Sequence, residues 1–596
     1  MKKETLPTEN ASSAYEKPIG TEQLLEFLRI LQTYQSGKAA TDRRIISSEN
    51  WWKLRNSAEE SSETDVVKNG FASRSGWLHN VIVSKHADAM DAYPEPRILP
   101  REEDDGAEAE MLSAIIPCVL EQNRFEETYD EAMWRKMKGG TAVYKVFWDR
   151  EKLNGLGDIS VECVNLLNLF WEPGLSDIQK SRYFFHTELC DKDVLCERYP
   201  ELLGNGVKSD GFMTARFLYD DCVGTENKAT VVEVYYHKNV EGKNTLQYVK
   251  FVGDTVLFAT ENETEAQTDA LGRPRLPLSV TGLYDHGLYP YVFDSLFPIE
   301  GSPCGYGYVD ICRNPQTEID MLKTCFVRNA RVGSVPRYFS RGDGTINEEE
   351  FLDLENPIVH SVGGIDENAL RLIAHQSLDR TYLDLLKWDV NELRETSGNT
   401  ETASGNLSNG VTAAAAIAAL QEASGKGSRD STLSSYRAYA RLIELCIELI
   451  RQFYQLPRAF RILGQSGVQK FISYANGGLR PVSQGLDFDQ EIGLRLPVFD
   501  VKIVARKKDS YSRVAQNELA MQLFEKGFFD PENSKQALAC LALMSFDGKE
   551  SIMQAVAENA KNIERNSTKT ASAPLASPDT AEAAKMRAEN APRPRE

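Results

Sequence analysis

The clearest pattern of apolar positions runs from Leu433 to Tyr454. Apolar residues recur there every three or four positions, and a second stripe of the same period lies beside the first. Only a narrow ribbon of charged residues remains on the other side of the predicted helix. This pattern predicts a helix that is buried over most of its circumference. Together with the alanine-rich residues before it, the predicted helix covers 411–456, with a kink near Gly425 and Gly427.

Between residues 141 and 298 the pattern changes to short runs that are rich in Val, Phe and Tyr and are separated by turn residues. Such runs are typical of β-strands. They read TAVYKVFWD, GDISVECV, RYFFHTEL, ATVVEVYYH, LQYVKFV and DTVLFAT. Nearer the C-terminus, FDVKIVAR alternates apolar and polar residues and predicts one more strand. The prolines of EPRILPREEDD instead predict a break in regular structure.

Helical spacing marks most of the remaining chain. It predicts several helices over 21–93, and it predicts one helix over 306–333 and another over 377–396. Gly398 is a suitable glycine cap for the last of these. Further helices are predicted near the C-terminus, starting close to Tyr511, Pro531 and Lys549.

A small mixed segment, 334–376, separates the two helices 306–333 and 377–396. It combines the predicted strands VPRYFS and PIVHSV with a short predicted helix, NEEEFLD. Helices and strands are thus mostly segregated along the chain, which favours the α+β fold class.

The chain has 596 residues and a net charge of −20, with 41% hydrophobic residues. It is long enough for several packed units. Tight, static DNA binding is not expected, because it usually requires a basic excess that releases counterions from phosphate. The ten cysteines are scattered without a CxxC pair, which favours reduced thiols in the cytosol. We expect a soluble intracellular protein with no membrane partner, since the sequence has no signal peptide and no apolar run of about 20 residues.

Motifs of catalysis are missing from the sequence. It lacks the GxxxxGK[ST] loop that cradles phosphates, as well as HExxH and GxSxG. The segment LDFDQEIG begins like a calcium loop but lacks its length and its terminal glutamate. Histidines such as His186 stand alone and fit core positions better than metal sites. No cofactor is expected, although a spatially assembled catalytic site stays open because catalytic triads need not be sequential.

The segment 397–410 is polar but almost uncharged. Glu401 is the only formal charge between Thr396 and Gly410. The alanine-rich run that follows has an ordinary explanation, because alanine is the best helix former. The alternative is that small side chains let helices of neighbouring subunits approach closely. In that case the loop lines a passage for a polyanion, which few cations would hold.

The order of these elements resembles that of the bacteriophage portal proteins. The resemblance lies in GSPCGYGYVDICRNPQTEIDMLKTCFVRNA, in LSNGVTAAAAIAALQEASGKGSRD, and in EPRILPREEDD with RKMKGGTAVYKVFWD and LNLFWEPGLSDIQKSRYFF. It covers roughly Val81 to Tyr454. It implies a homo-oligomeric ring of about twelve subunits at one capsid vertex. Double-stranded DNA would pass through this ring without sequence specificity during packaging and ejection.

The resemblance also implies a division of the chain. The expected parts are a disordered N-terminus (1–20), a wing (21–305), a first stem helix (306–333), a clip (334–376), a second stem helix (377–396), a tunnel loop (397–410), a long kinked wing helix (411–456), wing strands (457–508), crown helices (509–565) and a disordered tail (566–596). The partners implied are the terminase large subunit, a head-completion or tail adaptor protein, and the major capsid and scaffold proteins.

Three groups of candidate functional residues follow from this division. In the tunnel loop they are Ser397, Asn399, Thr400, Glu401, Thr402, Ser404, Asn406, Ser408 and Asn409. In the stem they are Glu318, Asp320, Lys323, Arg328, Arg331, Lys387 and Arg394, where the acidic residues are expected early and the arginines late in the first helix, to suit its macrodipole. In the clip they are Arg337, Arg341, Asp343, Glu348 and Glu349, as partner contacts.

Two other functions stay open. One is a cytosolic enzyme with an unrecognised acidic metal site, such as a nuclease, which would be a monomer or small oligomer. The other is a different structural phage component that shares the ring but lacks the clip between two stem helices.

Overall fold

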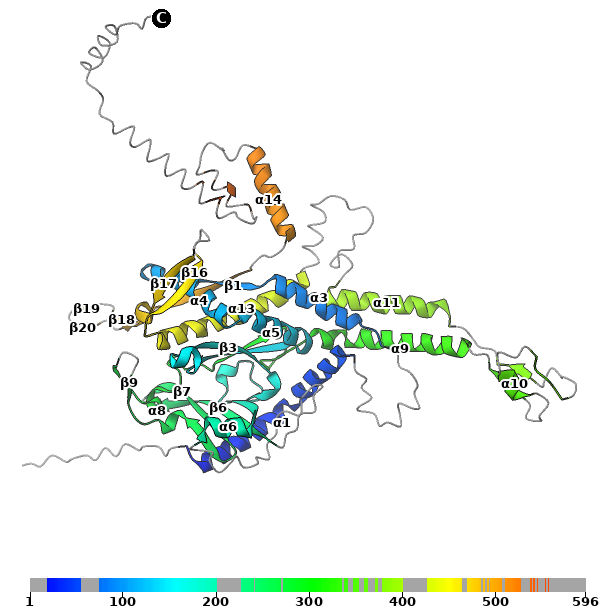
Figure 1. Ribbon diagram of the computed structural model, residues 1–596, viewed down its shortest axis with the longest axis horizontal. Helices are drawn as coiled ribbons and strands as arrows, with labels where there is room; N and C mark the ends of the chain where they lie inside the picture. The colour runs from blue at the N-terminus through cyan, green and yellow to red at the C-terminus, as the bar shows by residue number, and fades with distance from the viewer. Residues whose placement is uncertain are drawn as a thin grey trace, which may run out of the picture. The chain divides into compact units, whose positions relative to one another are not determined.

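The computed structural model describes residues 19–54, 74–200, 227–240, 242–268, 272–334, 337–340, 347–352, 358–362, 370–373, 378–399, 426–463, 469–483, 486–487, 490–491, 494–505 and 510–526, with scattered positions between 536 and 556 (Figure 1). The chain forms two compact units. The first comprises Met1–Arg458 and Ala475–Arg506, and the second comprises Ala459–Tyr474 and Lys507–Glu596.

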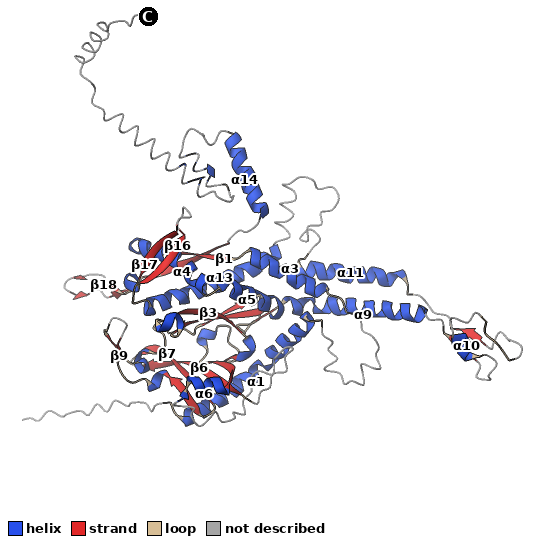
Figure 2. Ribbon diagram, in the orientation of Figure 1, coloured by secondary structure: helices blue, strands red, loops and turns tan. Residues whose placement is uncertain are grey.

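Helices and strands are both abundant in the first unit, in agreement with the α+β class (Figure 2). Its helices are α1 (Thr21–Trp52), α3 (Trp77–Asp91), α4 (Gly106–Gln122), α5 (Phe125–Gly139), α6 (Lys192–Arg198), α8 (Leu278–Thr281), α9 (Tyr308–Ser334), α10 (Glu348–Leu352), α11 (Arg380–Ser397) and α13 (Lys426–Phe453). The second unit holds β17 (Gln469–Tyr474), α14 (Ser510–Glu525) and all but the first residue of β16 (Arg458–Leu463).

The runs predicted as strands between 141 and 298 all form strands. Five of the strands make one antiparallel sheet in the order β4 (Leu169–Trp171), β5 (Tyr183–Asp191), β6 (Lys228–Val240), β7 (Lys243–Val252) and β8 (Thr255–Ala259). Another sheet has the order β11 (Tyr291–Ser295), β2 (Thr141–Asp149) and β3 (Asp158–Val164). Short two-stranded pairs are β9 (Gln267–Thr268) with β10 (Pro274–Arg275), β12 (Phe297–Pro298) with β13 (Gly305–Tyr306), β14 (Tyr338–Ser340) with β15 (Leu370–Leu372), β18 (Val482–Ser483) with β21 (Leu494–Arg495), and β19 (Leu486–Asp487) with β20 (Gln490–Glu491).

The five-stranded sheet is covered by α1. Leu24, Phe27 and Leu31 stand one helical turn apart on α1, and they pack with Phe185 and Phe251 of the sheet in one buried cluster. The spacing of three and four residues places these side chains on the same side of the helix. The N-terminal helix is therefore fixed to the sheet by apolar burial.

A buried carboxylate joins several strands on the polar side of this core. Glu233 on β6 accepts hydrogen bonds from Lys145 Nζ on β2 over 2.8 Å and from Lys250 Nζ on β7 over 3.2 Å. His186 Nδ1 lies 3.4 Å from the same carboxylate, so this histidine is a core residue, as predicted. Burial alone would raise the pKa of Glu233, but Lys145, His186 and Lys250 together hold it well below its ordinary value of 4.5.

The depressed pKa of Glu233 predicts a loss of stability in acid. The contribution is fully present above pH 4.5, the ordinary value, and is lost as the pH falls through the lower folded value. We expect Glu233→Gln to lower the free energy of unfolding at pH 7 by about 3–5 kcal/mol, because it leaves the buried Lys145 and the half-buried Lys250 without their anion. Urea unfolding at several pH values should show this difference shrinking below pH 4.5. A difference that stays constant into acid would contradict the prediction.

The end of helix α5 makes a close backbone contact with β13, just before α9. Gly140 follows α5 with φ +84°, and its N–H donates to Lys136 O over 2.8 Å. A Cβ on Gly140 would collide with the backbone of Tyr306 and lie 2.6 Å from Gly305 O. Glycine is needed here both for the left-handed conformation and for the close approach.

Replacing Gly140 with alanine should therefore be strongly destabilising. We expect a loss on the order of 3 kcal/mol, from left-handed strain plus a backbone collision. Gly155→Ala is the matched control, because Gly155 has φ +89° but nothing within 4 Å of its Cβ position. That control should cost about 1 kcal/mol in urea unfolding. Equal losses at the two positions would show that the contact with Tyr306 does not matter.

The break predicted at the prolines of EPRILP is wrong. Residues Pro94–Pro100 form β1, which pairs with β22 (Phe499–Ala505). The N–H of Ile98 donates to the Ser113 hydroxyl, which donates to the Ile98 carbonyl. Both backbone groups of Ile98 therefore point away from β22. The prolines stand at even-numbered positions like Ile98, and strand backbones alternate direction with a period of two. Their missing N–H groups therefore cost no hydrogen bond to β22.

The small segment between α9 and α11 agrees only in part with its prediction. The short helix is present as α10, and VPRYFS contains β14. PIVHSV forms no strand in its described residues 358–362, where only Ser361 makes a single bridge. The partner of β14 is instead β15, Leu370–Leu372. The β-branched residues of PIVHSV favour a strand, but β14 forms its hydrogen bonds with Leu370–Leu372 instead.

Candidate functional site

Helices α9 and α11 lie side by side and form a helical hairpin (Figure 1). The side of α11 that its own subunit covers carries Asp389, Leu393 and Ser397, which are all buried. Their spacing of four residues forms one stripe. Burial and the neighbouring carboxylates of Glu318 and Glu392 raise the pKa of Asp389. Carboxyl groups of α9 and α11 thus lie close enough to influence one another electrostatically.

The outer sides of this hairpin carry apolar residues that the subunit leaves uncovered. On α11, Leu385 is 48% exposed and Trp388 is 70% exposed. On α9, Met321 is 62% exposed and Val332 is 41% exposed. Leu385 and Trp388 stand three positions apart, and Met321 and Val332 stand eleven positions apart. Both spacings place the two residues on the same side of a helix. We call Met321, Val332, Leu385 and Trp388 the outer stripes.

Exposed apolar residues continue into the segment between the two helices. Val362 and Leu352 are 83% and 77% exposed, the highest values for large apolar side chains in the described residues. Phe339 on β14 is also exposed. A soluble monomer rarely leaves so much apolar surface in one region, so these residues indicate a surface that other chains cover.

The charged residues predicted as partner contacts in this segment are only partly described. Arg337 is exposed, and its carbonyl accepts from Ile373 N over 2.8 Å. Glu349 is exposed on α10. Arg341 and Asp343 lie outside the described residues, as does the side chain of Glu348.

The macrodipole explanation for Glu318 and Asp320 is wrong. Helix α9 begins at Tyr308, so both residues lie beyond its first turn, where the dipole effect has faded. The first-turn carboxylate is Asp310, which accepts from Gly307 N over 3.0 Å. Asp320 instead accepts from the Ser75 backbone N–H over 2.8 Å and from the Ser75 hydroxyl over 2.6 Å. It therefore ties the residues before α3 to α9.

The basic residues predicted in the hairpin have different environments. Lys323 Nζ donates to Arg74 O over 3.4 Å, and the Arg394 guanidinium lies 5.3 Å from the Trp77 ring centre. Arg328 and Arg331 are exposed on α9, and Lys387 is exposed beside Asp384. The first two residues bind the hairpin to the rest of the subunit, while the other three leave basic charge on its surface.

Two residues predicted to line a channel are buried inside the subunit. Ser397 is 3% exposed and Asn399 is 7% exposed. Gly398 between them is left-handed and caps α11, as predicted. The channel-facing role therefore does not hold for Ser397 and Asn399. The other predicted residues, Thr400, Glu401, Thr402, Ser404, Asn406, Ser408 and Asn409, lie outside the described residues.

Helix α13 follows the predicted tunnel loop in the chain and is buried in the first unit. Its described part, Lys426–Phe453, is buried at Ile443, Ile447 and Leu449. The predicted charged ribbon is exposed or half-buried, and it consists of Arg437, Arg441, Glu444, Glu448 and Arg451. The expected residues 411–425 of this helix, with the kink at Gly425, lie outside the described residues.

A fully buried ion pair holds the first half of α13. Lys136 Nζ on α5 donates to Asp294 Oδ1 on β11 over 2.6 Å and to Ser435 Oγ on α13 over 2.7 Å. The Ser435 hydroxyl in turn donates to Asp294 Oδ2 over 2.9 Å. Burial lowers the pKa of Lys136, and the Asp294 carboxylate partly opposes this shift.

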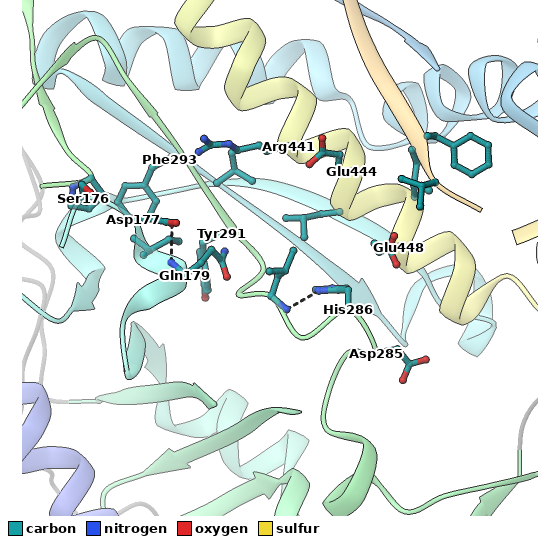
Figure 3. Close-up of a pocket in the computed structure, with 18 of the residues that line it drawn as sticks. Ser176, Asp177, Gln179, Asp285, His286, Tyr291, Phe293, Arg441, Glu444 and Glu448 are labelled. Carbon is teal, nitrogen blue, oxygen red and sulfur yellow. Dashed lines mark hydrogen bonds between the residues drawn. The ribbon is translucent and has the colours of Figure 1, made fainter. Parts of the chain in front are cut away.

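A cavity of about 1430 Å³ borders the charged ribbon of α13 (Figure 3). Arg441, Glu444 and Glu448 line it from that helix, and Asp285 and His286 line it from a loop. Burial raises the pKa of Glu444 and of Glu448, while neighbouring arginines oppose both shifts. Burial also lowers the pKa of His286 to about 4. The cavity presents carboxylates interleaved with cations.

The carboxylates of this cavity are individually paired or flanked rather than grouped. Glu448 accepts from Arg451 Nη1 over 2.7 Å and 2.8 Å. Across the described part of the chain, no group of three or more His, Cys, Asp or Glu side chains is placed to hold a metal ion. Nor does any helix in that part have the length and apolar character needed to cross a membrane.

The uncovered outer stripes are typical of a chain that packs against other protein chains. The family model of the phage P22-like portal protein matches residues 88–274 and 299–595. The chain belongs to this family of structural phage proteins. Among curated proteins, none matches it.

Proposed function

We propose that this protein forms a ring of about twelve copies at one capsid vertex, through which double-stranded DNA enters and leaves. A separate terminase motor packages the DNA, and the same ring later docks the tail adaptor. The chain itself carries no phosphate-binding loop of the GxxxxGK[ST] type, so the motor's ATPase would be another protein.

The observation that carries this proposal is the pair of outer stripes on α9 and α11. Met321 and Val332 lie on one helix, and Leu385 and Trp388 lie on the other. Contact between α9 of one subunit and α11 of the next joins two different surfaces. Such heterologous contacts generate a closed ring when the rotation between subunits divides a full turn.

The division of the chain supports the same function. We assign the hairpin α9–α11 to the stem and the segment 334–376 to the clip, where Arg337, Glu349 and the exposed apolar residues meet the motor and then the adaptor. The sheets and α13 form the wing, the C-terminal helices from 509 form the crown, and residues 400–410 form the tunnel loop. The major capsid and scaffold proteins contact the wing.

The charge of the chain suits passage rather than retention of DNA. The net charge is −20, and the loop residues 400–410 carry Glu401 as their only charge. Acidic walls repel phosphates, and small polar side chains exchange contacts readily with water. DNA can then slide without being held at any one position.

The native mass of the purified protein tests the proposal, together with particle images from the same fraction. We expect ring-shaped particles with a central hole. Their mass should be about twelve times that of one subunit, as for a closed cyclic assembly of that size. A stable monomer or dimer that stays so in the presence of scaffold and capsid proteins would overturn it. Nuclease activity that disappears when single carboxylates of the cavity are changed would then favour the enzyme alternative.

Deleting residues 401–409 tests the role of the tunnel loop. We expect rings to assemble normally and packaged DNA to be lost from the capsid, since the proposed role of the loop is contact with DNA and that of the stem is contact between subunits. The measurement is the packaged DNA length and its retention over time. Unchanged packaging and retention would contradict this role.

A further inference from the structure

The segment between α9 and α11 contains a small module with two opposite faces. Strands β14 and β15 form its centre, and α10 packs on one side of them. The rings of Tyr338 on β14 and Phe351 on α10 meet edge to face, with their centroids 5.0 Å apart. Leu372 stands opposite Tyr338 in the strand register, so both side chains lie on the same face of the pair. This face is the one toward α10.

The other face of the strand pair is basic and apolar. Phe339 and Arg371 stand opposite each other, so their side chains share the face that Tyr338 does not use. Arg337 lies two positions before Phe339, and its carbonyl accepts from Ile373 N, so its side chain belongs to the same face. Phe339 is 65% exposed, and both arginines are exposed as well. We call Arg337, Phe339 and Arg371 the basic face.

The outer side of α10 is acidic and apolar. Glu349 points away from Phe351 and from the strands, because two positions along a helix are about 200° of rotation. Leu352 lies three positions after Glu349, on the same side of the helix, and is 77% exposed. Glu350 is already occupied, since its Oε2 accepts from His360 N over 2.8 Å. We call Glu349 and Leu352 the acidic face.

The charges of both faces lack an ion-pair partner within the described residues. No ion pair there includes Arg337, Arg371 or Glu349. Duplex DNA offers phosphates to the arginines but nothing apolar to Phe339, because its bases are stacked inside the helix. A protein surface that combines a carboxylate with an exposed apolar side chain suits the whole basic face. The acidic face of a second copy of this chain has that composition.

We propose that the basic face of one copy packs on the acidic face of the next copy around the ring. The proposal rests on the portal function proposed above. The two faces lie on opposite sides of one module, and head-to-tail assembly requires a contact between two different surfaces. Arg337 and Arg371 of one copy pair with Glu349 of the next, and Phe339 packs against Leu352. The motor and the adaptor then meet a seam to which two copies contribute.

Charge reversal tests this contact in the full-length protein. Arg337→Glu should lower the fraction of subunits in rings about tenfold near the midpoint of assembly, because it sets like charges against each other. Glu349→Arg should have the same effect for the same reason. The two changes combined should assemble several-fold better than either alone, since the charges are then exchanged. Arg29→Glu, at an exposed position of α1, is the matched control and should assemble normally.

The combined variant decides between pairing and an unrelated defect. A combination that assembles no better than the single variants would overturn the pairing. Normal assembly of both single variants would overturn it too, and a simultaneous loss of motor binding would assign the basic face to the motor instead. A wild-type chain that forms no ring would overturn the proposed portal function, which is a different result.

Cross-linking gives a second test that does not depend on the strength of assembly. Phe339→Cys combined with Leu352→Cys, treated with a short bismaleimide, should give covalent oligomers up to the full ring in denaturing gels. Each single variant should stay at the background set by the ten native cysteines, because the contact joins two different residues. Intact rings of the combined variant that show only this background would overturn the contact between the two faces.

Discussion

Replacing Trp388 with glutamate is expected to abolish ring assembly while leaving the subunit folded. Trp388 is 70% exposed in the single subunit, so its removal takes away little packing within that subunit. In the proposed ring it is buried against the next subunit. Loss of an aromatic anchor costs about 2–4 kcal/mol at an interface, and a desolvated carboxylate adds to the cost. Because the loss recurs at every contact of the ring, we expect subunits instead of rings in native mass measurements.

The control for this prediction is the same substitution at an exposed apolar residue outside the hairpin. Leu276 is 63% exposed and precedes α8. Leu276→Glu should form rings like the wild type, and the far-ultraviolet circular dichroism of both variants should be unchanged. Rings of normal mass in Trp388→Glu would show that α11 contributes no essential contact between subunits.

The outer stripe of α11 has a signal in the sequence, although charged residues alone do not mark it. Leu386 and Leu393 mark the side of the second stem helix that would face its own subunit. Trp388 lies on nearly the opposite side, at two positions after Leu386 in a helix with 3.6 residues per turn. A large aromatic residue on that side is the signal that indicates a contact with another chain.

Strands and helices were predictable where local pattern and pairing agree. The run TAVYKVFWD forms β2 with the predicted bounds, because its apolar residues pack on both sides of a sheet. The prediction failed at Pro94–Pro100, where the direction of each N–H decides whether proline is tolerated. That direction depends on Ser113 and on β22, which is distant in sequence.

The buried contacts of the candidate site were not predictable, because they join residues far apart in the chain. Ser75 and Asp320 are separated by 245 positions, and Lys136 and Asp294 by 158. In the sequence each of these residues is one charged or polar group among many. Ser397 and Asn399 were assigned to a channel for the same reason, since polar composition alone does not reveal burial inside the subunit.

Replacing Lys136 with methionine is expected to destabilise the first unit by about 3–5 kcal/mol, because it leaves a buried carboxylate without its cation. The side chains of Lys136 and Asp294 are both 0% exposed and make their contact over 2.6 Å. Urea unfolding followed by tryptophan fluorescence measures the effect, since all seven tryptophans precede residue 459 and so lie in the first unit. The subunit concentration must be held constant, because ring assembly stabilises the folded chain.

Three further variants separate the cost of an unpaired charge from the cost of altered packing: a double variant, the single variant Asp294→Leu and a surface control. Lys136→Met combined with Asp294→Leu removes both charges, and it should recover part of the lost stability because apolar replacements of buried ion pairs are often tolerated. Lys387→Met, at a residue whose side chain is 73% exposed beside Asp384, should change the free energy of unfolding by less than about 0.5 kcal/mol. If the double variant is as unstable as Lys136→Met plus the separate cost of Asp294→Leu, the two residues do not act as a pair. In that case the apolar stripes of α13 hold the helix in position, and the hydrogen bonds of Ser435 contribute little to stability.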